Sequence, residues 1–326
     1  MTTIWPFPVP YVLAICAFLL VPGTALPASR TTQPEYVRLL DWAKTRAFSP
    51  SWIKHDDLLL LTRGSTRIRL KMASREANVN GVRVWLLYPA VQRDGAVRLS
   101  KVDIEKTLEP LIAPERAGRS VKTICLDPGH GGRDPGFQDG RRDEKTYTLL
   151  LAKEIRNELG KQKVKAVLTR STDYYVDLTS RPQVAKRRGA DMFVSLHLNA
   201  AGGSAAGTAK GVEVFALTPA WAPSTMTGDK DMAMAGNRYD KQNMYLAYQV
   251  QKALASGLGA DDRGVQRARF VVLKDAAMPS ILIEGGFMSH PAESRRIYDP
   301  SYRKRMAKAI ADGIMAYKRV TDPKTK

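Results

Sequence analysis

The amino-acid sequence predicts an α/β protein, in which a mixed, mostly parallel sheet is flanked by helices on both faces and preceded by a small β-rich domain. From residue 121 onward, short apolar runs alternate with longer segments of helical periodicity, as in a sheet covered on both faces. Before residue 114 the apolar pattern is that of strands and hairpins. With 326 residues, 44% of them apolar, the chain can form two domains with real cores, which excludes disordered and collagen-like classes.

The N-terminal segment resembles a secretory signal peptide over residues 1–25. Residues 11–21 are apolar, fewer than the ~20 that a membrane span needs, and small residues follow at 23–25. No Lys or Arg precedes the run, so an anchor or a buried strand stays open, whereas a lipoprotein site at Cys16 is less favoured. After cleavage we expect no stable membrane span and a secreted, periplasmic or cell-wall-associated protein. Cys125 would then be the only cysteine, buried in a strand and inert.

Residues 31–113 are predicted to form the β-rich accessory domain. Asn80-Gly81 stands between two strand-like runs and predicts a tight hairpin, and Asp94-Gly95 repeats that signal. Strands are expected at 58–62, 66–72, 75–79, 82–88 and 96–100, and a helix at 102–112. The polar, basic stretch 114–120 is the expected linker.

Residues 121–318 are predicted to form the α/β domain, followed by a basic tail at 319–326. Strands are expected at 121–126, 164–169, 192–197, 211–217, 270–273 and 280–284, and helices at 144–159, 179–188, 243–258 and 301–317. Because α/β sheets usually bind ligands beyond their strand ends, polar residues at those ends are the candidates for chemistry.

Four such residues stand out. His130 lies in a glycine-rich loop after the first strand, Glu144 begins the first helix, where the helix dipole favours a carboxylate, and His197 and Glu284 each end a strand. Two histidines and a glutamate are a set that binds catalytic zinc, with a further carboxylate left to accept a proton. The spacing matches no compact zinc motif, so core histidines, a phosphate-cradling loop at 127–136 and a glutamate capping a sheet edge stay open.

A resemblance to a known family narrows these alternatives. The motifs are VKTICLDPGHGGRDPG, an acidic helix start at 143–145, LTSR, GADMFVSLHLNA, GVEVF, DRGVQRARFVVL and PSILIEGGFMSHPAES. In this order, over residues 121–318, they are similar to the catalytic domain of zinc-dependent N-acetylmuramoyl-L-alanine amidases of the cell-division and autolysin type.

The resemblance implies roles for particular residues. His130, Glu144 and His197 would bind one Zn²⁺ per chain, and Glu284 would be the catalytic acid/base. Arg181 and Asn199 stand where family motifs place residues that line the site. For these two, substrate binding and a structural role are equally open.

The implied activity is hydrolysis of the amide bond between the lactyl group of N-acetylmuramic acid and L-alanine in peptidoglycan. An activator protein is a possible partner. A non-catalytic peptidoglycan-binding protein of the same fold is the alternative, although all four residues of the set are intact. The formal charge of 51 − 32 = +19 is also compatible with a nucleic-acid or lipopolysaccharide binder, but the basic residues are dispersed and no nucleic-acid-binding motif occurs. We therefore expect no nucleic-acid partner and attribute the charge to attraction by the acidic wall.

Three features depart from the family or lie outside its motifs. His290 stands where the family more often has Asn, and we expect it to be a supporting residue or a bystander. The insert 218–242 is shorter than the zinc-blocking helix of cell-division relatives, so we expect a loop at the rim of the site without self-inhibition. Residues 56–113 loosely resemble the N-terminal module of copper amine oxidases, but they contain no histidine, and we expect a wall-binding role.

Overall fold

The computed structural model describes residues 34–116, 118, 120–228 and 232–323 of the chain. The predicted signal peptide at 1–25 lies outside the described residues. In the part of the chain that is described, no helix is long and apolar enough to cross a membrane.

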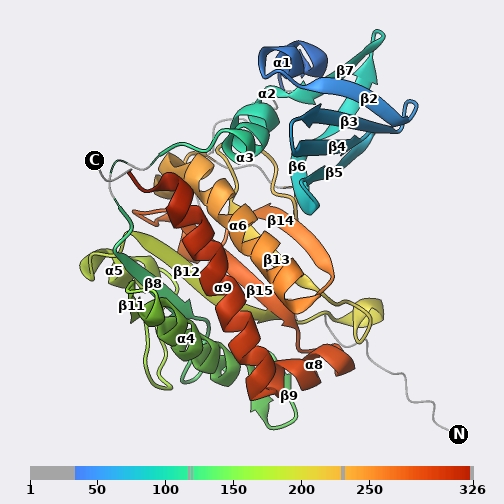
Figure 1. Ribbon diagram of the computed structural model, residues 1–326. Helices are drawn as coiled ribbons and strands as arrows, with labels where there is room; N and C mark the ends of the chain where they lie inside the picture. Colours follow the sequence, from blue (N-terminus) through green and yellow to red (C-terminus); the bar gives the residue numbers. More distant parts are fainter. Residues whose placement is uncertain (1–33, 117, 119, 229–231, 324–326) are drawn as a thin grey trace, which may run out of the picture.

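A mixed sheet forms the middle of the α/β part (Figure 1). Its strands lie side by side in the order β11, β8, β12, β15, β13 and β14. Neighbouring strands are parallel, except that β13 runs antiparallel to β15. The strands are β8 (Thr123–Pro128), β11 (Lys165–Leu168), β12 (Met192–Asn199), β13 (Val212–Leu217), β14 (Asp262–Ala268) and β15 (Ser280–Phe287). The predicted fold class is confirmed.

Helices cover both faces of this sheet. Three long helices pack together on one face (Figure 1), and two short ones pack against the other. They are α4 (Glu144–Lys161), α6 (Asp240–Leu258) and α9 (Pro300–Thr321) on the first face, and α5 (Ser180–Arg187) and α7 (Val271–Lys274) on the second. Strand residues alternate accordingly, because Ile124 and Leu126 pack under the long helices and Cys125 packs under the short ones.

The N-terminal region is β-rich, as predicted. An antiparallel series runs β6, β5, β4, β3, β2, with β7 and β1 paired beside β6. Its elements are β1 (Tyr36–Arg38), α1 (Leu39–Thr45), β2 (Ser49–Lys54), β3 (Leu58–Arg63), β4 (Thr66–Lys71), β5 (Ser74–Val79), β6 (Val82–Arg93), β7 (Ala96–Ser100), α2 (Lys101–Asp103), a π-helical segment (Ile104–Leu108) and α3 (Glu109–Ile112). Both predicted hairpin turns form, with Asn80 and Gly81 at φ values of 50° and 90°.

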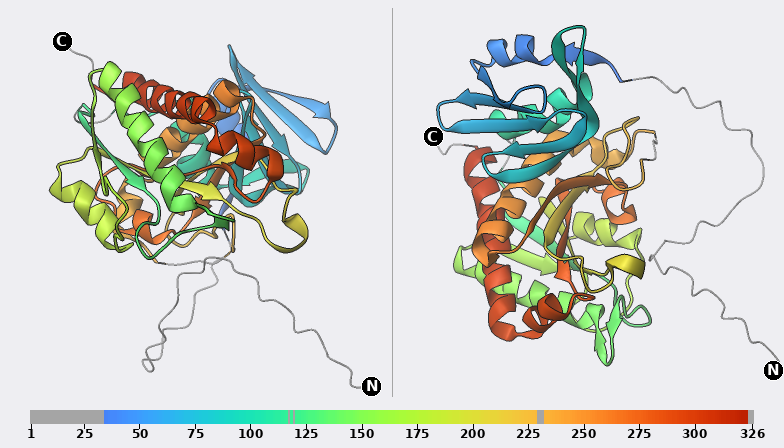
Figure 2. Two further views of the ribbon diagram at one scale, coloured as in Figure 1. Left: turned by 90° about the horizontal axis from the view of Figure 1, so that it is seen from below. Right: turned by 90° about the vertical axis from the view of Figure 1, so that its right-hand side faces the viewer.

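The two regions share one sheet and one core. Val84 of β6 pairs with Val265 of β14 in parallel, so the sheet continues from one region into the other. Tyr248 of α6 donates a hydrogen bond to the carbonyl of Val79 at 3.2 Å, and buried apolar residues form a single cluster across the junction. The right-hand view of Figure 2 shows the N-terminal region packed against the upper end of the α/β part. The predicted domain boundaries stay a prediction, but α9 extends to Thr321, past the expected limit of 318.

One predicted strand is wrong. Residues 270–273 were expected to be a strand, but they lie at the start of the short helix α7, and the strand of this segment is β14. A short apolar run cannot be distinguished by periodicity from a buried helical turn. The sequence pattern does not predict β14, because charged residues interrupt its apolar residues.

The insert 218–242 does not lie at the rim of the site. Because β13 runs antiparallel to β15, Glu213 at the start of β13 pairs with Glu284, and the insert leaves from the opposite end of the strand. Its contacts are at that end, where Tyr239 donates a hydrogen bond to the carbonyl of Ala277, which precedes β15. The described part of the insert contains one short 3₁₀ turn, at Ala235–Tyr239, before α6 begins. The expectation of a rim loop is therefore wrong.

Candidate active site

Three residues from three different elements converge beyond the ends of β8 and β12. His130 lies in the loop after β8, Glu144 is the first residue of α4, and His197 lies near the end of β12. One ligand atom from each lies within 4.8 Å of the others. The two imidazole rings meet edge to face, with 4.8 Å between their centroids. The three side chains predicted as metal ligands are therefore brought together.

Glu144 lies at the centre of this group and is buried. Its Oε1 is 3.1 Å from Nδ1 of His197 and accepts a hydrogen bond from the backbone N–H of Leu198 at 3.0 Å. Its Oε2 is 3.1 Å from Nε2 of His130 and accepts the N–H of Phe137 at 3.0 Å. Burial alone would raise the pKa of Glu144, but the hydrogen bonds and positive charges of the two histidines hold it well below its usual range.

Two glycines make room for this convergence. A Cβ at Gly129 would lie 2.4 Å from the ring of His197, and one at Gly136 would lie 2.6 Å from Oε2 of Glu144. His130 itself adopts a φ of 61°, a left-handed conformation that non-glycine residues rarely adopt. The glycine-rich sequence therefore lets the loop fold tightly over the carboxylate.

Asp134 fixes the orientation of His130, a role that the sequence analysis missed. Its Oδ2 lies 2.8 Å from Nδ1 of His130, which leaves Nε2 to face Glu144. Burial lowers the pKa of His130, but its bonds to Asp134 and Glu144 outweigh that effect and raise it to about 10. A carboxylate behind a histidine is the usual support of a metal ligand, and the spacing of four residues within the loop could have revealed it.

Arg181 lies beneath the loop. Its side chain is 1% exposed, and its guanidinium donates to Oδ1 of Asp127 at 2.9 Å and to the carbonyl of His130 at 3.0 Å. Asp127, also missed from the sequence, accepts a further hydrogen bond from Ser195 at 2.8 Å. This geometry favours the structural role for Arg181, because its donors are engaged with the chain itself.

Glu284 stands beside the three ligands on the neighbouring strand. It pairs with His197 of β12 on one side and with Glu213 of β13 on the other. Its Oε2 is buried and has no hydrogen-bond partner among the described residues. Burial, together with the negative charges of Glu144 and Glu213, raises the pKa of Glu284 well above its ordinary value.

Asn199 contacts Glu213, which the sequence analysis did not select. Its Nδ2 donates to Oε1 of Glu213 at 2.6 Å, while Gln266 donates to Oε2 of the same carboxylate. Glu213 is buried, so these bonds hold it next to Glu284. Asn199 therefore lies at the edge of the site and helps to fix the side chain of Glu213. Its expected contact with substrate stays a prediction.

Two remaining residues are bystanders. His290 accepts hydrogen bonds at Nδ1 from the N–H groups of Ala292 and Glu293, and so caps helix α8 (Pro291–Tyr298). Cys125 is fully buried, and burial raises the pKa of its thiol far above neutrality. Both observations agree with the expectations from the sequence.

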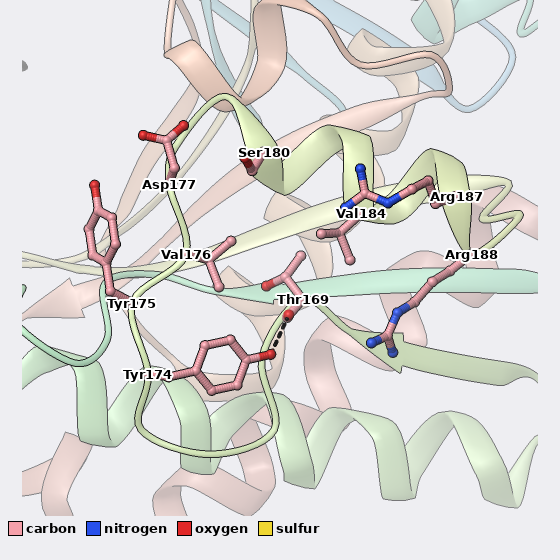
Figure 3. A pocket seen from close by; sticks show the side chains of 9 residues that line it. All are labelled: Thr169, Tyr174, Tyr175, Val176, Asp177, Ser180, Val184, Arg187 and Arg188. Carbon is pink, nitrogen blue, oxygen red and sulfur yellow. Dashed lines mark hydrogen bonds between the residues drawn. The ribbon is translucent and has the colours of Figure 1, made fainter.

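A cavity of about 550 Å³ lies between α5 and the segment after β11. Figure 3 shows Tyr174 and Tyr175 on one side of it, with the hydroxyl of Tyr174 donating a hydrogen bond to the carbonyl of Thr169, and Arg187 and Arg188 on the other side. None of the predicted ligands or Glu284 lines it.

The donor set at the convergence suits a zinc ion. Zinc is commonly bound by two imidazole nitrogens and a carboxylate oxygen, with a fourth position left for water. The three donor atoms are already close together, and the unpartnered Oε2 of Glu284 is available beside them for a proton. The residues present therefore fit this metal.

Comparison with known proteins agrees with this geometry. Residues 124–316, more than half of the chain, match the family described as N-acetylmuramoyl-L-alanine amidase. The chain is 32% identical to the N-acetylmuramoyl-L-alanine amidase AmiA of Escherichia coli K12 over 232 residues, which span 63% of this chain and 78% of that protein. It is 33% identical to the amidase LytC of Bacillus subtilis over 61% of this chain and 36% of that protein.

Solved structures give the same result. An N-acetylmuramoyl-L-alanine amidase from Clostridium difficile 630 is 33% identical, with a TM-score of 0.53 over 62% of this chain and 98% of that one. The CwlD amidase from Clostridioides difficile, solved with the GerS lipoprotein, is 28% identical, with a TM-score of 0.51 over 61% and 99%. All four residues of the predicted set lie inside the matched range.

Proposed function

This chain belongs to the N-acetylmuramoyl-L-alanine amidase family, and from that premise we propose that it hydrolyses the bond between the lactyl group of N-acetylmuramic acid and L-alanine in peptidoglycan. The observation that carries the proposal is the convergence of His130, Glu144 and His197 beside the buried, unpartnered Oε2 of Glu284. A protein that only binds the wall would have no need to bury a carboxylate without a partner, because such burial costs stability.

We expect His130, Glu144 and His197 to hold one Zn²⁺ per chain. A zinc ion in such a site polarises an amide carbonyl and lowers the pKa of water toward ~7. The chain prepares this site through the hydrogen bonds that keep Glu144 ionised and through Asp134, which orients His130.

Glu284 is the proposed proton carrier. Its Oε2 accepts a proton from the attacking water and then donates it to the amide nitrogen of L-alanine as the carbon–nitrogen bond breaks. A carboxyl group with a raised pKa suits both steps near neutral pH, since it can hold the proton between them. The lactyl carboxylate and the free amine of the stem peptide are the products.

We also propose that the protein acts outside the cytoplasm, at the cell wall. The support is the signal-like sequence of residues 1–25 and the charge of +19, which attracts the chain to an acidic polymer in a salt-dependent way. An activator is a further possible partner, because one similar solved structure is a complex of an amidase with a lipoprotein.

Mass spectrometry of digested sacculi tests this function. Purified chain, with and without added zinc, is incubated with sacculi, and we expect free stem peptides that begin with L-alanine, together with intact glycan strands. If the sacculi stay unchanged while the chain binds them, the non-catalytic alternative is correct. If the purified chain digests sacculi with no second protein present, it needs no activator.

A further inference from the structure

A row of residues crosses the sheet from the site into the N-terminal region. His197, Glu284 and Glu213 are paired across β12, β15 and β13. Glu213 in turn pairs with Gly264 of β14, where an added Cβ would lie 2.9 Å from Cγ of Arg83 on β6. Arg83 therefore stands three strands away from Glu284, at the same level of the sheet.

These side chains share one face. Val84, Val214 and Ile283, each a neighbour of a residue in the row, belong to the core under the long helices. Because side chains alternate along a strand, Arg83 and Glu284 point to the opposite face. The N-terminal region thus extends the face on which the site lies.

A cavity of about 470 Å³ lies at the far end of this row. It is lined by the β5–β6 hairpin of the N-terminal region and by residues 210 and 261–263 of the α/β part, and we call it the hairpin pocket. Arg263 lines the pocket and also reaches toward the site, because its Nε is 3.3 Å from Oε2 of Glu213 and its guanidinium lies 4.9 Å from the ring centroid of Phe287.

The hairpin pocket presents charges of both signs. Arg83 lies 3.4 Å from Glu76, and Lys210 lies 3.1 Å from Asp261, with all four side chains about half exposed. Such exposed ion pairs contribute little net stability, because water screens them, so a ligand of matching charge can replace either partner. Asp262, by contrast, is engaged by N–H donors of the chain, one of them the backbone N–H of Arg83 at 2.7 Å.

We propose that the hairpin pocket binds the distal, charged residues of the stem peptide, so that the N-terminal region forms part of the substrate-binding surface. This inference rests on the proposed function. A stem peptide that contains a diamino acid carries both carboxylates and an ammonium group, as the paired charges require. The acetylated sugars of the glycan carry no ionised group once the lactyl carboxyl is in amide linkage.

The dimensions agree with this occupant. Adjacent strands lie about 4.8 Å apart, so three strand steps separate Glu284 from Arg83 by roughly 14 Å. An extended peptide spans about 3.3–3.6 Å per residue, so roughly four residues beyond the scissile bond reach the pocket. A stem of two residues is too short to reach it.

Kinetics on two substrates of different length test the proposal. The probes are N-acetylmuramoyl dipeptide and an N-acetylmuramoyl pentapeptide with a diamino acid at its third position. We expect Arg83→Ala to lower kcat/KM for the pentapeptide at least about fivefold more than for the dipeptide, through lost charge-assisted hydrogen bonds. Lys210→Ala provides a second, independent variant, and a thermal melt checks that each variant is folded.

Arg69→Ala is the matched control, because Arg69 is an exposed arginine on β4 of the same region, outside the pocket. It should leave the ratio of the two kcat/KM values as it is in the unmodified chain. An equal effect of Arg83→Ala and Lys210→Ala on both substrates, or no effect on either, would overturn the pocket while the proposed function stands. Failure of the unmodified, zinc-loaded chain to cleave either substrate and to release stem peptides from sacculi would overturn both.

Discussion

The site has a glutamate on each side, and the electrostatic surroundings of the two differ in sign. On the side of the glycine-rich loop and α4, Glu144 is surrounded by two histidines and two backbone N–H groups, and its pKa is held low. On the side of β13 and β15, Glu284 faces a second buried carboxylate, one of its oxygens has no partner, and its pKa is raised. The surroundings therefore give the two glutamates different chemistry: Glu144 stays ionised and is suited to bind a metal, whereas Glu284 is suited to exchange a proton.

The largest expected effect follows from removing the proton carrier. Glu284→Gln keeps the shape of the side chain but cannot accept a proton, so turnover should fall by ~10²–10⁴, the usual contribution of a positioned general base. Rates of stem-peptide release from sacculi measure this. Near-normal turnover would mean that the proton moves through another group.

On the side of the glycine-rich loop and α4, removing a metal ligand should lower the affinity for zinc. His197→Ala should lower zinc affinity at least about tenfold, because one of three protein ligands is lost. The double variant His130→Ala/His197→Ala should retain no stoichiometric zinc, as measured by competition with a chelator. One zinc ion per chain in that double variant would rule out the site.

A smaller effect on zinc affinity is expected at Asp134, which contacts the ligand His130. Asp134→Asn should weaken zinc binding less than His197→Ala does, by about tenfold, the lower end of the usual range for a group that orients a metal ligand, since it replaces the carboxylate that orients His130. Asp139→Asn is a suitable control, because Asp139 is an exposed carboxylate further along the same segment, in the short strand Gln138–Asp139, where it accepts a hydrogen bond from Tyr298. Identical zinc affinities of the two variants would show that Asp134 does not support the ligand.

The smallest effect is expected at the far end of β13. Replacing residues 226–233 of the insert by a short glycine-serine linker should change turnover by less than about threefold, because surface loops tolerate replacement and this one leaves from the end away from Glu284. Turnover on sacculi is the measurement. A hundredfold rise would identify the insert as an inhibitory lid.

Local signals in the sequence were sufficient for much of the fold. Asn80-Gly81 predicted its hairpin because few other residue pairs adopt two successive positive φ angles. The strand order could not be read in the same way, since the antiparallel entry of β13 depends on long-range pairing, and this is why the insert was placed at the wrong end.

The site was only partly accessible to the same reasoning. Strand ends and a helix start selected His130, Glu144, His197 and Glu284, but their roles came from the family resemblance, because residues far apart in sequence show no metal spacing. Asp127 and Glu213 were missed, since each lies inside an apolar strand and reveals its purpose only through partners on other strands.

The zinc content of two matched variants tests the division between the two glutamates most directly. Glu144→Gln and Glu284→Gln each replace a carboxyl group by an amide of nearly the same size and shape. After zinc loading and removal of free metal, elemental mass spectrometry should find about one zinc per chain in Glu284→Gln and much less in Glu144→Gln. Loss of zinc from Glu284→Gln, or its full retention in Glu144→Gln, would contradict the roles assigned to them.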